Sequence, residues 1–515
     1  MADLDNATDL ASAIKSGYTF DGATIDVGAL LADGQPHPDA RIRLPLAMMN
    51  RHGLVAGATG TGKTRTLQGL AEQLSDAGVA VFLADMKGDL SGLAVPGKGG
   101  EKLEARTEAL GQDWKATGYP VEFLCLGGLG DGVPVRATPT SFGPTLLSKV
   151  LELNPTQSSC LELIFRWADE RGYELLDLKD VRAVVAYLTS AEGKNELKEL
   201  GGVSAATAGV ILRELSSLAA RGAEVFFGEP EFDVSDIVRT APDGRGVISV
   251  LELPAVQEQP ELFSTFLMWL LADLFEALPE VGDTDKPKLV FFFDEAHLLF
   301  NGAPKPFLES VTKTVRLIRS KGVGVFFVTQ TPTDVPSDVL AQLANRIQHA
   351  LRAYTPNDAK ALKATVSTFP KTTYDLAETL TSLGIGEAVV TVMSEDGVPT
   401  PVAPTRLFAP QSEMGPMDET AMRAAIAASP LTPRYGQSVD NESAYERLER
   451  AQAERQQQAE VEEQTKAEAR PRSAPKPAPH VSPLEAILGQ KTAHNLATAV
   501  GKEIARSLFG TRKRR

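Results

Sequence analysis

One segment constrains the fold of this chain more than any other. Residues 57–64 read GATGTGKT and match the phosphate-binding pattern G-x-x-x-x-G-K-[ST] at every fixed position. An apolar stretch that starts at Gly53 precedes the segment, and the stretch behind it sets leucines on one face at spacings of three and four. A second apolar segment, 79–86, follows at once. The sequence therefore predicts a strand, a glycine loop, a helix and a second strand parallel to the first.

The residue types of this loop explain how it binds phosphate. Glycines let the backbone wrap so tightly that successive N–H groups point at phosphate oxygens, and the following helix adds its positive end. Lys63 is expected to bridge the β- and γ-phosphates of ATP, and the Thr64 hydroxyl is expected to ligate Mg²⁺. We therefore predict ATP and Mg²⁺ as the ligands. The predicted nucleotide-binding residues are Gly57, Ala58, Thr59, Gly60, Thr61, Gly62, Lys63, Thr64 and Arg65.

Hydrolysis needs a carboxylate near an attacking water, and residues 291–295 supply one. Their sequence, FFFDE, is an apolar strand that ends in two acids at its carboxyl edge, where ligands of open α/β sheets bind. We predict that Asp294 holds the Mg²⁺ shell and that Glu295 polarises the water. His297 completes the letters DEAH, which alone do not indicate the helicase class of that name. We interpret His297 as a packing or coupling residue.

Three further polar residues are candidates for the site. Gln330 ends the predicted strand 322–330, and an amide there would lie beside the γ-phosphate and sense its presence. A simple strand-end turn is the alternative. Arg316 and Arg319 lie three residues apart near the end of a predicted helix, where either could act as an arginine finger on a neighbouring subunit. Surface arginines are often solvated or ion-paired instead, and spacing does not decide between these roles.

The remaining patterns predict an α/β fold with a helical insertion. Four helical stretches between about 144 and 227, without intervening strands, are typical of a domain inserted into a sheet. The helix predicted at 261–278 is apolar almost all round, so we expect it to be buried between layers. Further strands are expected at 246–253, 288–296, 346–354 and 387–393.

The bulk composition is that of a large globular protein. The 515 residues are 43% hydrophobic and 23% charged, and they contain no apolar run as long as a membrane span requires. The start, MADLDNATDL, lacks the basic and apolar regions of a signal peptide. Cys125 and Cys160 make no metal motif and are interpreted as core thiols. We therefore expect a cytoplasmic protein without a transmembrane segment.

Charge is unevenly distributed along the chain. The net charge of −15 argues against general attraction to nucleic acid but leaves room for a local basic channel. From residue 481 to the end, seven Lys and Arg residues stand against two Glu. Leu496, Val500, Ile504 and Leu508 form an apolar stripe in this basic tail. We expect the stripe to dock on the protein's own core or on a neighbouring subunit, with nucleic acid or a membrane surface as alternatives.

Several long motifs, taken in order, resemble one family. They are GATGTGKT, the turn DMKGD at 85–89, FFFDEAHLLF, RSKGVGVFFVTQTPTDVP and RIQHALRAYTPNDAKA. Together they resemble the HerA-like branch of the FtsK/HerA ATPases, most of all its YjgR-like subgroup. The resemblance runs from about Leu44 to Phe408.

This resemblance implies a RecA-like motor core that assembles as a hexameric ring and, in better-known relatives, pulls double-stranded DNA through its pore. It favours Arg319 over Arg316 as the finger, and it makes Arg136 and Arg352 candidates for accessory arginines. Too few residues precede Gly53 for the full N-terminal β-barrel of many HerA proteins, which argues against their nuclease partnership.

These observations lead to seven predicted divisions of the chain. They are a short β or irregular segment at 1–43, the first part of the ATPase core at 44–143, an inserted helical domain at 144–240, the second part of the core at 241–410, a charged helical extension at 411–470, a proline-rich linker at 471–481, and an amphipathic helix with a basic tail at 482–515.

Two classes of function compete at this point. The first is a ring-forming, ATP-driven translocase on double-stranded DNA. The second is an ATPase or nucleotide switch that acts on protein or membrane-associated partners, which the acidic charge and the C-terminal tail favour. A small-molecule kinase is disfavoured, because the chain has no evident acceptor-binding signature.

Overall fold

The computed structural model describes residues 2–468 except 197–200, 258, 283 and 301–304. The chain divides into two compact units, residues 1–450 and residues 451–515. The predicted proline-rich linker and basic C-terminal helix lie outside the described residues. Among the helices of the described residues, none combines the length and apolarity needed to cross a membrane.

One large sheet forms the centre of the first unit. Within the described residues it has 12 strands in the order β2-β1-β12-β11-β10-β3-β9-β8-β4-β7-β5-β6, and every neighbouring pair from β10 to β6 is parallel. This confirms the predicted α/β class with a mostly parallel sheet. The strands of the parallel part are β3 (Gly53–Ala56), β4 (Ala80–Asp85), β5 (Val121–Leu126), β6 (Val133–Val135), β7 (Ile248–Glu252), β8 (Leu289–Phe293), β9 (Val323–Thr329) and β10 (Asn345–His349).

The strands on either side of the glycine loop are parallel but not adjacent. Between β3 and β4 lie β9 and β8, which both come much later in the chain. As a result, the strand that carries the acidic pair is only two positions from the strand that leads into the glycine loop.

The N-terminal residues are more regular than the irregular or short-stranded lead-in that the sequence predicted for 1–43. They form α1 (Ala2–Gly17) and two long strands, β1 (Thr24–Ala32) and β2 (Gln35–Pro45). These strands extend the sheet in antiparallel fashion through β12 (Ala403–Leu407) and β11 (Glu387–Thr391). The buried Tyr18 ties the helix down by donating its hydroxyl to the carbonyl of Val390 at 2.9 Å. Long-range contacts of this kind leave no periodic signal in the local sequence.

Helices cover both faces of the sheet, which splits the core into two clusters. In β8, Phe291 and Phe293 belong to one cluster, and Val290 and Phe292 belong to the other. The alternation follows from the two-residue period of a strand. The leucines of α2 fill the second cluster, whereas the apolar residues of α8 fill the first, as expected for a helix buried between layers. The remaining helices are α2 (Lys63–Asp76), α3 (Glu101–Ala109), α4 (Pro139–Val150), α5 (Pro155–Glu170), α6 (Leu178–Thr189), α7 (Ala205–Ala220), α8 (Pro260–Ala277), α9 (His297–Phe300), α10 (Lys305–Ile318), α11 (Ser337–Leu340), α12 (Pro356–Val366), α13 (Leu376–Ser382), α14 (Glu419–Ala428), α15 (Thr432–Tyr435) and α16 (Ala444–Glu468).

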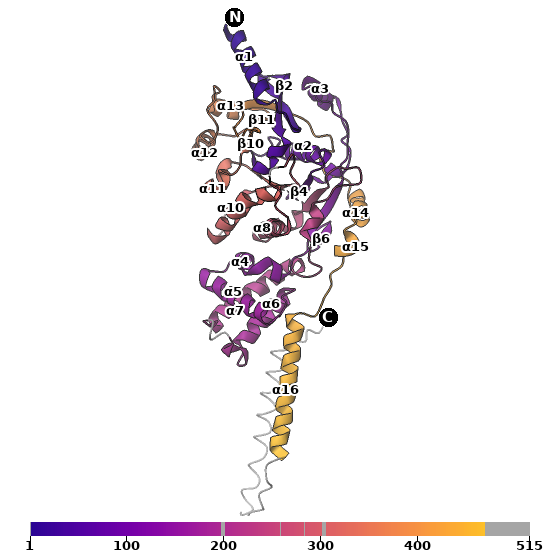
Figure 1. The fold of residues 1–515 in the computed structure, drawn as a ribbon, viewed down its shortest axis with the longest axis vertical. Helices are drawn as coiled ribbons and strands as arrows, with labels where there is room; N and C mark the ends of the chain where they lie inside the picture. The colour runs from indigo at the N-terminus through magenta and orange to yellow at the C-terminus, as the bar shows by residue number, and fades with distance from the viewer. Residues whose placement is uncertain (1, 197–200, 258, 283, 301–304, 469–515) are drawn as a thin grey trace, which may run out of the picture. The chain divides into compact units, whose positions relative to one another are not determined.

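The helices α4, α5, α6 and α7 lie grouped together next to α8 (Figure 1). Local signals start two of them, because Asn154 and Asp177 each form a reciprocal capping box at the helix N-terminus. Their apolar faces join the same cluster as α8, with Trp167 stacked on Tyr173 at 5.4 Å. The four helices therefore share a continuous core with one face of the sheet.

A C-terminal segment is anchored to the helix that follows the glycine loop. The carboxylate of Glu72 on α2 accepts hydrogen bonds from the backbone N–H groups of Gln411 and Ser412 and from the Ser412 hydroxyl. Gln68, one turn earlier, donates to the Ser412 hydroxyl oxygen at 2.6 Å. Burial raises the pKa of Glu72 to about 7. Hydrogen bonds between residues far apart in the sequence thus fix the position of α2.

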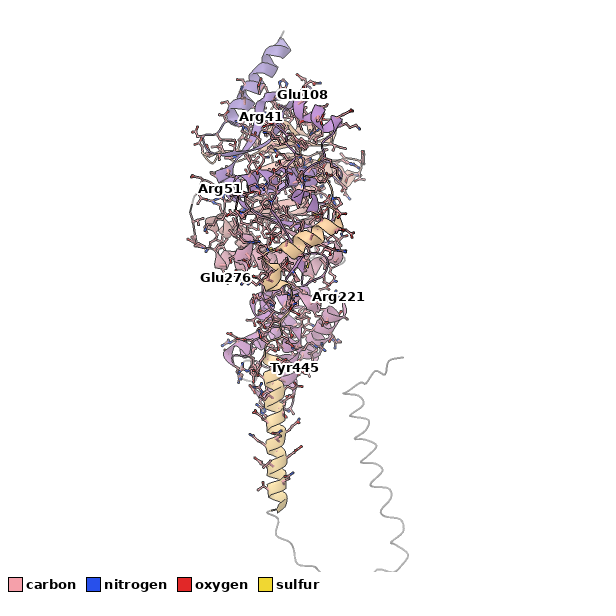
Figure 2. The ribbon with its side chains drawn as sticks, turned by 90° about the vertical axis from the view of Figure 1, so that its right-hand side faces the viewer. Arg41, Arg51, Glu108, Arg221, Glu276 and Tyr445 are labelled. Carbon is pink, nitrogen blue, oxygen red and sulfur yellow. The ribbon has the colours of Figure 1, made fainter. Side chains whose placement is uncertain are left out.

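The start of α16 is anchored in the same way. Ser443 and the backbone N–H of Tyr445 both donate to the buried carboxylate of Asp180 on α6. Tyr445 is labelled at the beginning of α16 in Figure 2. From Ala451 onward the helix belongs to the second unit, and its described side chains are almost all exposed.

Candidate functional site

The glycine loop forms a short arch between β3 and α2. Gly62 has a φ of +107°, and a Cβ there would lie 3.3 Å from the backbone nitrogen of Gly386. A Cβ on Gly57 would lie 2.4 Å from the Cβ of His349. Both positions therefore require glycine. Gly62 needs it for its backbone conformation, and neither position has room for a Cβ.

The N–H groups of this arch are open. Within the described part of the chain, the N–H groups of residues 59–64 donate no hydrogen bond, whereas those of Gly57 and Ala58 donate to the carbonyls of Thr329 and Ala350. Unpaired N–H groups at a helix N-terminus suit a phosphate ligand. The donors present therefore fit the triphosphate of a nucleotide.

The side chain of Lys63, the first residue of α2, folds back onto the phosphate loop. Its Nζ donates to the carbonyls of Gly57 at 2.6 Å and Ala58 at 3.2 Å. Burial lowers the pKa of Lys63, while the negative charges of Glu295 and Asp294 act in the opposite direction. The ammonium group is therefore within electrostatic range of both acids.

The acidic pair follows β8 at the same carboxyl edge of the sheet. Because Ala56 pairs with Thr329 and Phe293 pairs with Phe327, the loop and the acids leave neighbouring parts of this edge. Glu295 has a φ of +49°, which is uncommon for a residue with a side chain. Strain of this kind is concentrated at functional sites.

The two carboxylates have different surroundings. Burial and then the charge of Glu295 raise the pKa of Asp294 to about 7, against the opposing effect of the Lys87 ammonium. Oδ1 of Asp294 accepts a hydrogen bond from the N–H of Glu295 at 2.9 Å. Glu295 instead forms an ion pair with Lys87 at 3.1 Å, and its other oxygen lies 3.4 Å from Nδ1 of His297. A carboxylate pair beside a phosphate loop has the oxygen ligands that Mg²⁺ prefers.

Gln330 follows β9, the strand between the two motifs. Its neighbour Thr329 is buried and donates to Oδ2 of Asp334 at 2.6 Å, and the N–H of Gly57 donates to the carbonyl of Thr329 at 3.2 Å. Gln330 itself is exposed. The strand end is therefore fixed to the phosphate loop, while the amide of Gln330 is open to solvent.

The predicted arginine fingers lie elsewhere. Arg316 is exposed on α10, and Arg319 begins the short 3₁₀ turn η8 (Arg319–Lys321) that precedes β9. Arg319 is therefore at the amino end of a strand whose carboxyl end meets the phosphate loop. His52, just before β3, lies at the same amino edge and accepts a hydrogen bond from the N–H of Val325 at 3.0 Å. Burial lowers the pKa of His52 to about 4, and the charge of Arg319 adds to this shift.

The two weaker arginine candidates lie in different parts of the sheet. Arg136 follows β6 at the far edge of the sheet, is buried, and donates to the carbonyl of Tyr435 at 2.9 Å. Arg352 is exposed on the loop after β10, next to the strand that leads into the phosphate loop. Of the two, Arg352 is the one near the predicted site.

Sequence reasoning missed one residue that braces the phosphate loop. His349 ends β10 and is buried, with Nε2 2.9 Å from the hydroxyl of Thr66 and Nδ1 3.1 Å from the carbonyl of Thr61. Burial lowers its pKa to about 4, and the charge of Lys63 contributes. The predicted strand 346–354 contained His349, but only its pairing with β3 indicates this role.

A cavity of about 270 Å³ lies along α2 beside the phosphate loop. It begins at Arg65 and Thr66, the residues that follow Thr64, and extends to Gln73. Arg41, labelled in Figure 2, lines it from β2. Arg65 donates to Oε1 of Gln68 at 2.8 Å, so its position is fixed along the helix.

The family model described as "Helicase HerA-like C-terminal" matches residues 31–515. The chain belongs to this HerA-like family. It is thus a P-loop ATPase of the FtsK/HerA class, as its sequence motifs predicted. Membership of the YjgR-like subgroup stays a prediction.

Curated relatives agree with this placement. The chain is 22% identical over 394 residues to the "DNA double-strand break repair helicase HerA" of Sulfurisphaera tokodaii. The aligned region covers 74% of this chain and 69% of the relative. A protein of the same name from Saccharolobus solfataricus is 22% identical over 384 residues, covering 73% and 67%.

Solved structures show the same fold. The bacterial conjugative coupling protein TrwB, in an unbound form, has a TM-score of 0.52 at 15% identity and covers 79% of this chain and 95% of its own. TrwB in complex with ADP and Mg²⁺ has a TM-score of 0.50 at 16% identity, covering 77% and 99%. The HerA-like chain therefore has the architecture of the RecA-like ATPase cores.

Proposed function

We propose that this protein is a Mg²⁺-dependent ATPase that assembles as a ring and drives the movement of double-stranded DNA. The observation that carries the enzyme part is the shared edge of the sheet. There the open N–H groups of residues 59–64 and the acids Asp294 and Glu295 come from strands two positions apart. The complex of TrwB with ADP and Mg²⁺ supports the same ligands for this chain.

Each residue has a distinct task in this proposal. The loop N–H groups and Lys63 grip the phosphates, which requires Lys63 to leave the carbonyls of Gly57 and Ala58. Thr64 and Asp294 would hold Mg²⁺, which would supply positive charge to the phosphates. Glu295 accepts a proton from the attacking water.

Gln330 supplies the contact that reports hydrolysis. Its exposed amide follows a strand whose last residue is hydrogen-bonded to Gly57 at the start of the loop. An amide at this point can donate to a γ-phosphate oxygen and lose that contact when phosphate leaves. Movement of the β9 end is then coupled to the nucleotide state.

The proposed ring uses both edges of the sheet. The phosphate loop lies at the carboxyl edge and Arg319 at the amino edge of the same parallel strands. In a head-to-tail ring, one subunit's amino edge can face the next subunit's phosphate loop, so that Arg319 completes a neighbour's site. We propose six subunits, in keeping with the family resemblance of the sequence.

Double-stranded DNA is the proposed substrate, because the curated relatives are named as DNA double-strand break repair helicases. Steady-state ATPase activity should rise several-fold on addition of linear duplex DNA at low salt, and the rise should fade as salt screens phosphate contacts. Activity that is indifferent to duplex DNA of every length at low salt would rule out this substrate.

A second function remains open because the chain carries a net charge of −15 and a long exposed helix, α16. It is an ATPase or nucleotide switch acting on protein or membrane-associated partners, working in the cytoplasm. Removing residues 451–515 separates the two, since the cut leaves the contacts of Ser443 and Tyr445 with Asp180 intact. Loss of a co-purifying protein on this cut, together with ATPase activity that duplex DNA does not stimulate before or after the cut, would favour the second function.

A further inference from the structure

The turn between β4 and the next element brings a lysine to the acidic pair. Nζ of Lys87 lies 3.1 Å from Oε1 of Glu295, although 208 residues separate them in the chain. The contact exists because β4 and β8 are neighbouring parallel strands, with Ala84 paired to Phe293. Lys87 therefore comes from the same carboxyl edge as the acid it contacts.

The backbone that carries Lys87 is held firmly. The carboxylate of Asp85, the last residue of β4, accepts hydrogen bonds from the N–H groups of Lys87, Gly88 and Leu90 at 3.0, 2.8 and 2.7 Å. Asp85 is completely buried. Gln257 at the other side of the turn donates to the carbonyl of Met86 at 2.5 Å. The backbone position from which the Lys87 side chain reaches Glu295 is thus fixed.

The two oxygens of Glu295 differ in what they contact. Oε1 is held by Lys87, whereas Oε2 is buried and has no hydrogen-bond partner among the described residues. Nδ1 of His297 lies 3.4 Å from Oε2 but forms no hydrogen bond with it. A buried carboxylate oxygen without a partner is costly, unless a ligand or water completes it in the working site.

We infer that Lys87 is a positioning residue: by anchoring Oε1 of Glu295 it turns Oε2 toward the water that attacks the γ-phosphate. The inference rests on the proposed ATPase function, in which Glu295 is the base. In this inference Lys87 acts only through Glu295 and is not itself a catalytic residue. A base that is fixed in one orientation loses less of its catalytic effect to misaligned conformations.

An ordinary surface ion pair is the competing explanation for this contact. The Lys87 side chain is 50% exposed, and exposed ion pairs contribute little to stability. Glu295, however, is only 16% exposed and sits at a positive φ, so its side chain has few alternative positions. A positioning role and a surface role therefore differ in turnover rather than in stability.

The test compares Lys87→Met, which keeps the length of the side chain and removes its charge, with Lys87→Arg, which restores the charge. Lys87→Met should lower kcat by about 10- to 100-fold, as is common when an orienting partner is removed, with KM and nucleotide affinity unchanged. Lys87→Arg should recover most of kcat. Lys87→Gln is a second neutral variant, should Lys87→Met express poorly.

A matched control is Lys115→Met, which removes a lysine from another exposed ion pair, with Asp113 at 2.9 Å. It should leave kcat unchanged. The double variant Lys87→Met/Glu295→Gln should be no slower than Glu295→Gln alone, because the lysine acts only through the glutamate.

The outcomes separate the inference from the function on which it rests. Wild-type turnover by Glu295→Gln would remove Glu295 as the base and with it the proposed mechanism. If Glu295→Gln is inactive while Lys87→Met keeps wild-type kcat, only the role of Lys87 fails. Additive losses in the double variant, or weaker nucleotide binding by Lys87→Met, would likewise overturn the positioning role.

Discussion

Mixing two inactive variants tests whether Arg319 acts on a neighbouring subunit. Arg319 lies at the amino end of β9, and the phosphate loop lies at the carboxyl end of the same parallel strands. β9 has 7 residues, which separate its ends by roughly 20 Å at the rise of a parallel strand. An arginine side chain is much shorter than this distance. Arg319 therefore cannot serve the phosphate loop of its own chain.

The expected recovery follows from this geometry. Arg319→Ala subunits lack the finger, which costs about 10³- to 10⁵-fold in turnover, and Glu295→Gln subunits lack the base. A site in a mixed ring works when its own subunit keeps Glu295 and its neighbour keeps Arg319. With random assembly from equal amounts, each condition is met half of the time, so roughly a quarter of the sites should be competent.

The assay measures the rate of phosphate release as a function of the molar fraction of the two variants. Activity should pass through a maximum at equal amounts, near a quarter of the wild-type rate if sites act independently. The control mixes Arg316→Ala with Glu295→Gln, because Arg316 is an exposed arginine that lies three residues before Arg319. Activity that stays at the weighted sum of the two variants at every ratio, after subunit exchange has been verified with labelled protein, would refute a finger in trans.

Three further predictions concern binding and stability. Lys63→Ala should abolish binding of a fluorescent ATP analogue, because the phosphates lose their only cation within the loop; unchanged affinity would contradict this. The pKa of the buried Glu252 is raised to about 8 by its burial and then by Asp85, so the contribution of Glu252 to the free energy of unfolding should fall as pH rises from about 4.5 to 8, by about 1.4 kcal/mol for each pH unit within that window. Glu252→Gln should flatten this dependence in urea titrations at pH 5 and pH 8. Ser412→Ala should cost about 1–3 kcal/mol, since it removes one hydrogen bond from the buried Glu72 carboxylate and one from the Gln68 amide; an unchanged urea midpoint would show that the Ser412 hydroxyl does not stabilise α2.

The phosphate loop and the acidic pair could be predicted because their signals are local. Eight consecutive residues, 57–64, specify the glycine turn, and the apolar strand before Asp294 specifies where the acids emerge. The strand and helix around them follow from periodicities of two and about 3.6 residues. The confirmed family and fold rest on these same motifs.

What sequence could not supply was the order of the strands. The contact between Lys87 and Glu295 depends on β4 lying beside β8, and the bracing by His349 depends on β10 lying beside β3. These neighbours are far apart in the chain, so no window of sequence contains both partners. The length of the N-terminal strands, which the sequence predicted only as short strands or an irregular segment, has a related cause, because β1 is stabilised by pairing with β12 from the other end of the core.

The separation of Arg319 from the phosphate loop is also a matter of topology. A spacing of three residues between Arg316 and Arg319 left their roles undecided, whereas the direction of β9 places Arg319 at the opposite edge of the sheet from the loop. That position is compatible with the proposed role of Arg319 on a neighbouring subunit.

The central claim is that the glycine loop and the carboxylate of Glu295 form a single ATP-hydrolysing site. The most direct test follows the fate of radiolabelled ATP on Glu295→Gln in a single turnover with Mg²⁺. The account predicts that the variant holds ATP with near wild-type affinity and converts it to ADP slower by orders of magnitude. Conversion at the wild-type rate would contradict the claim.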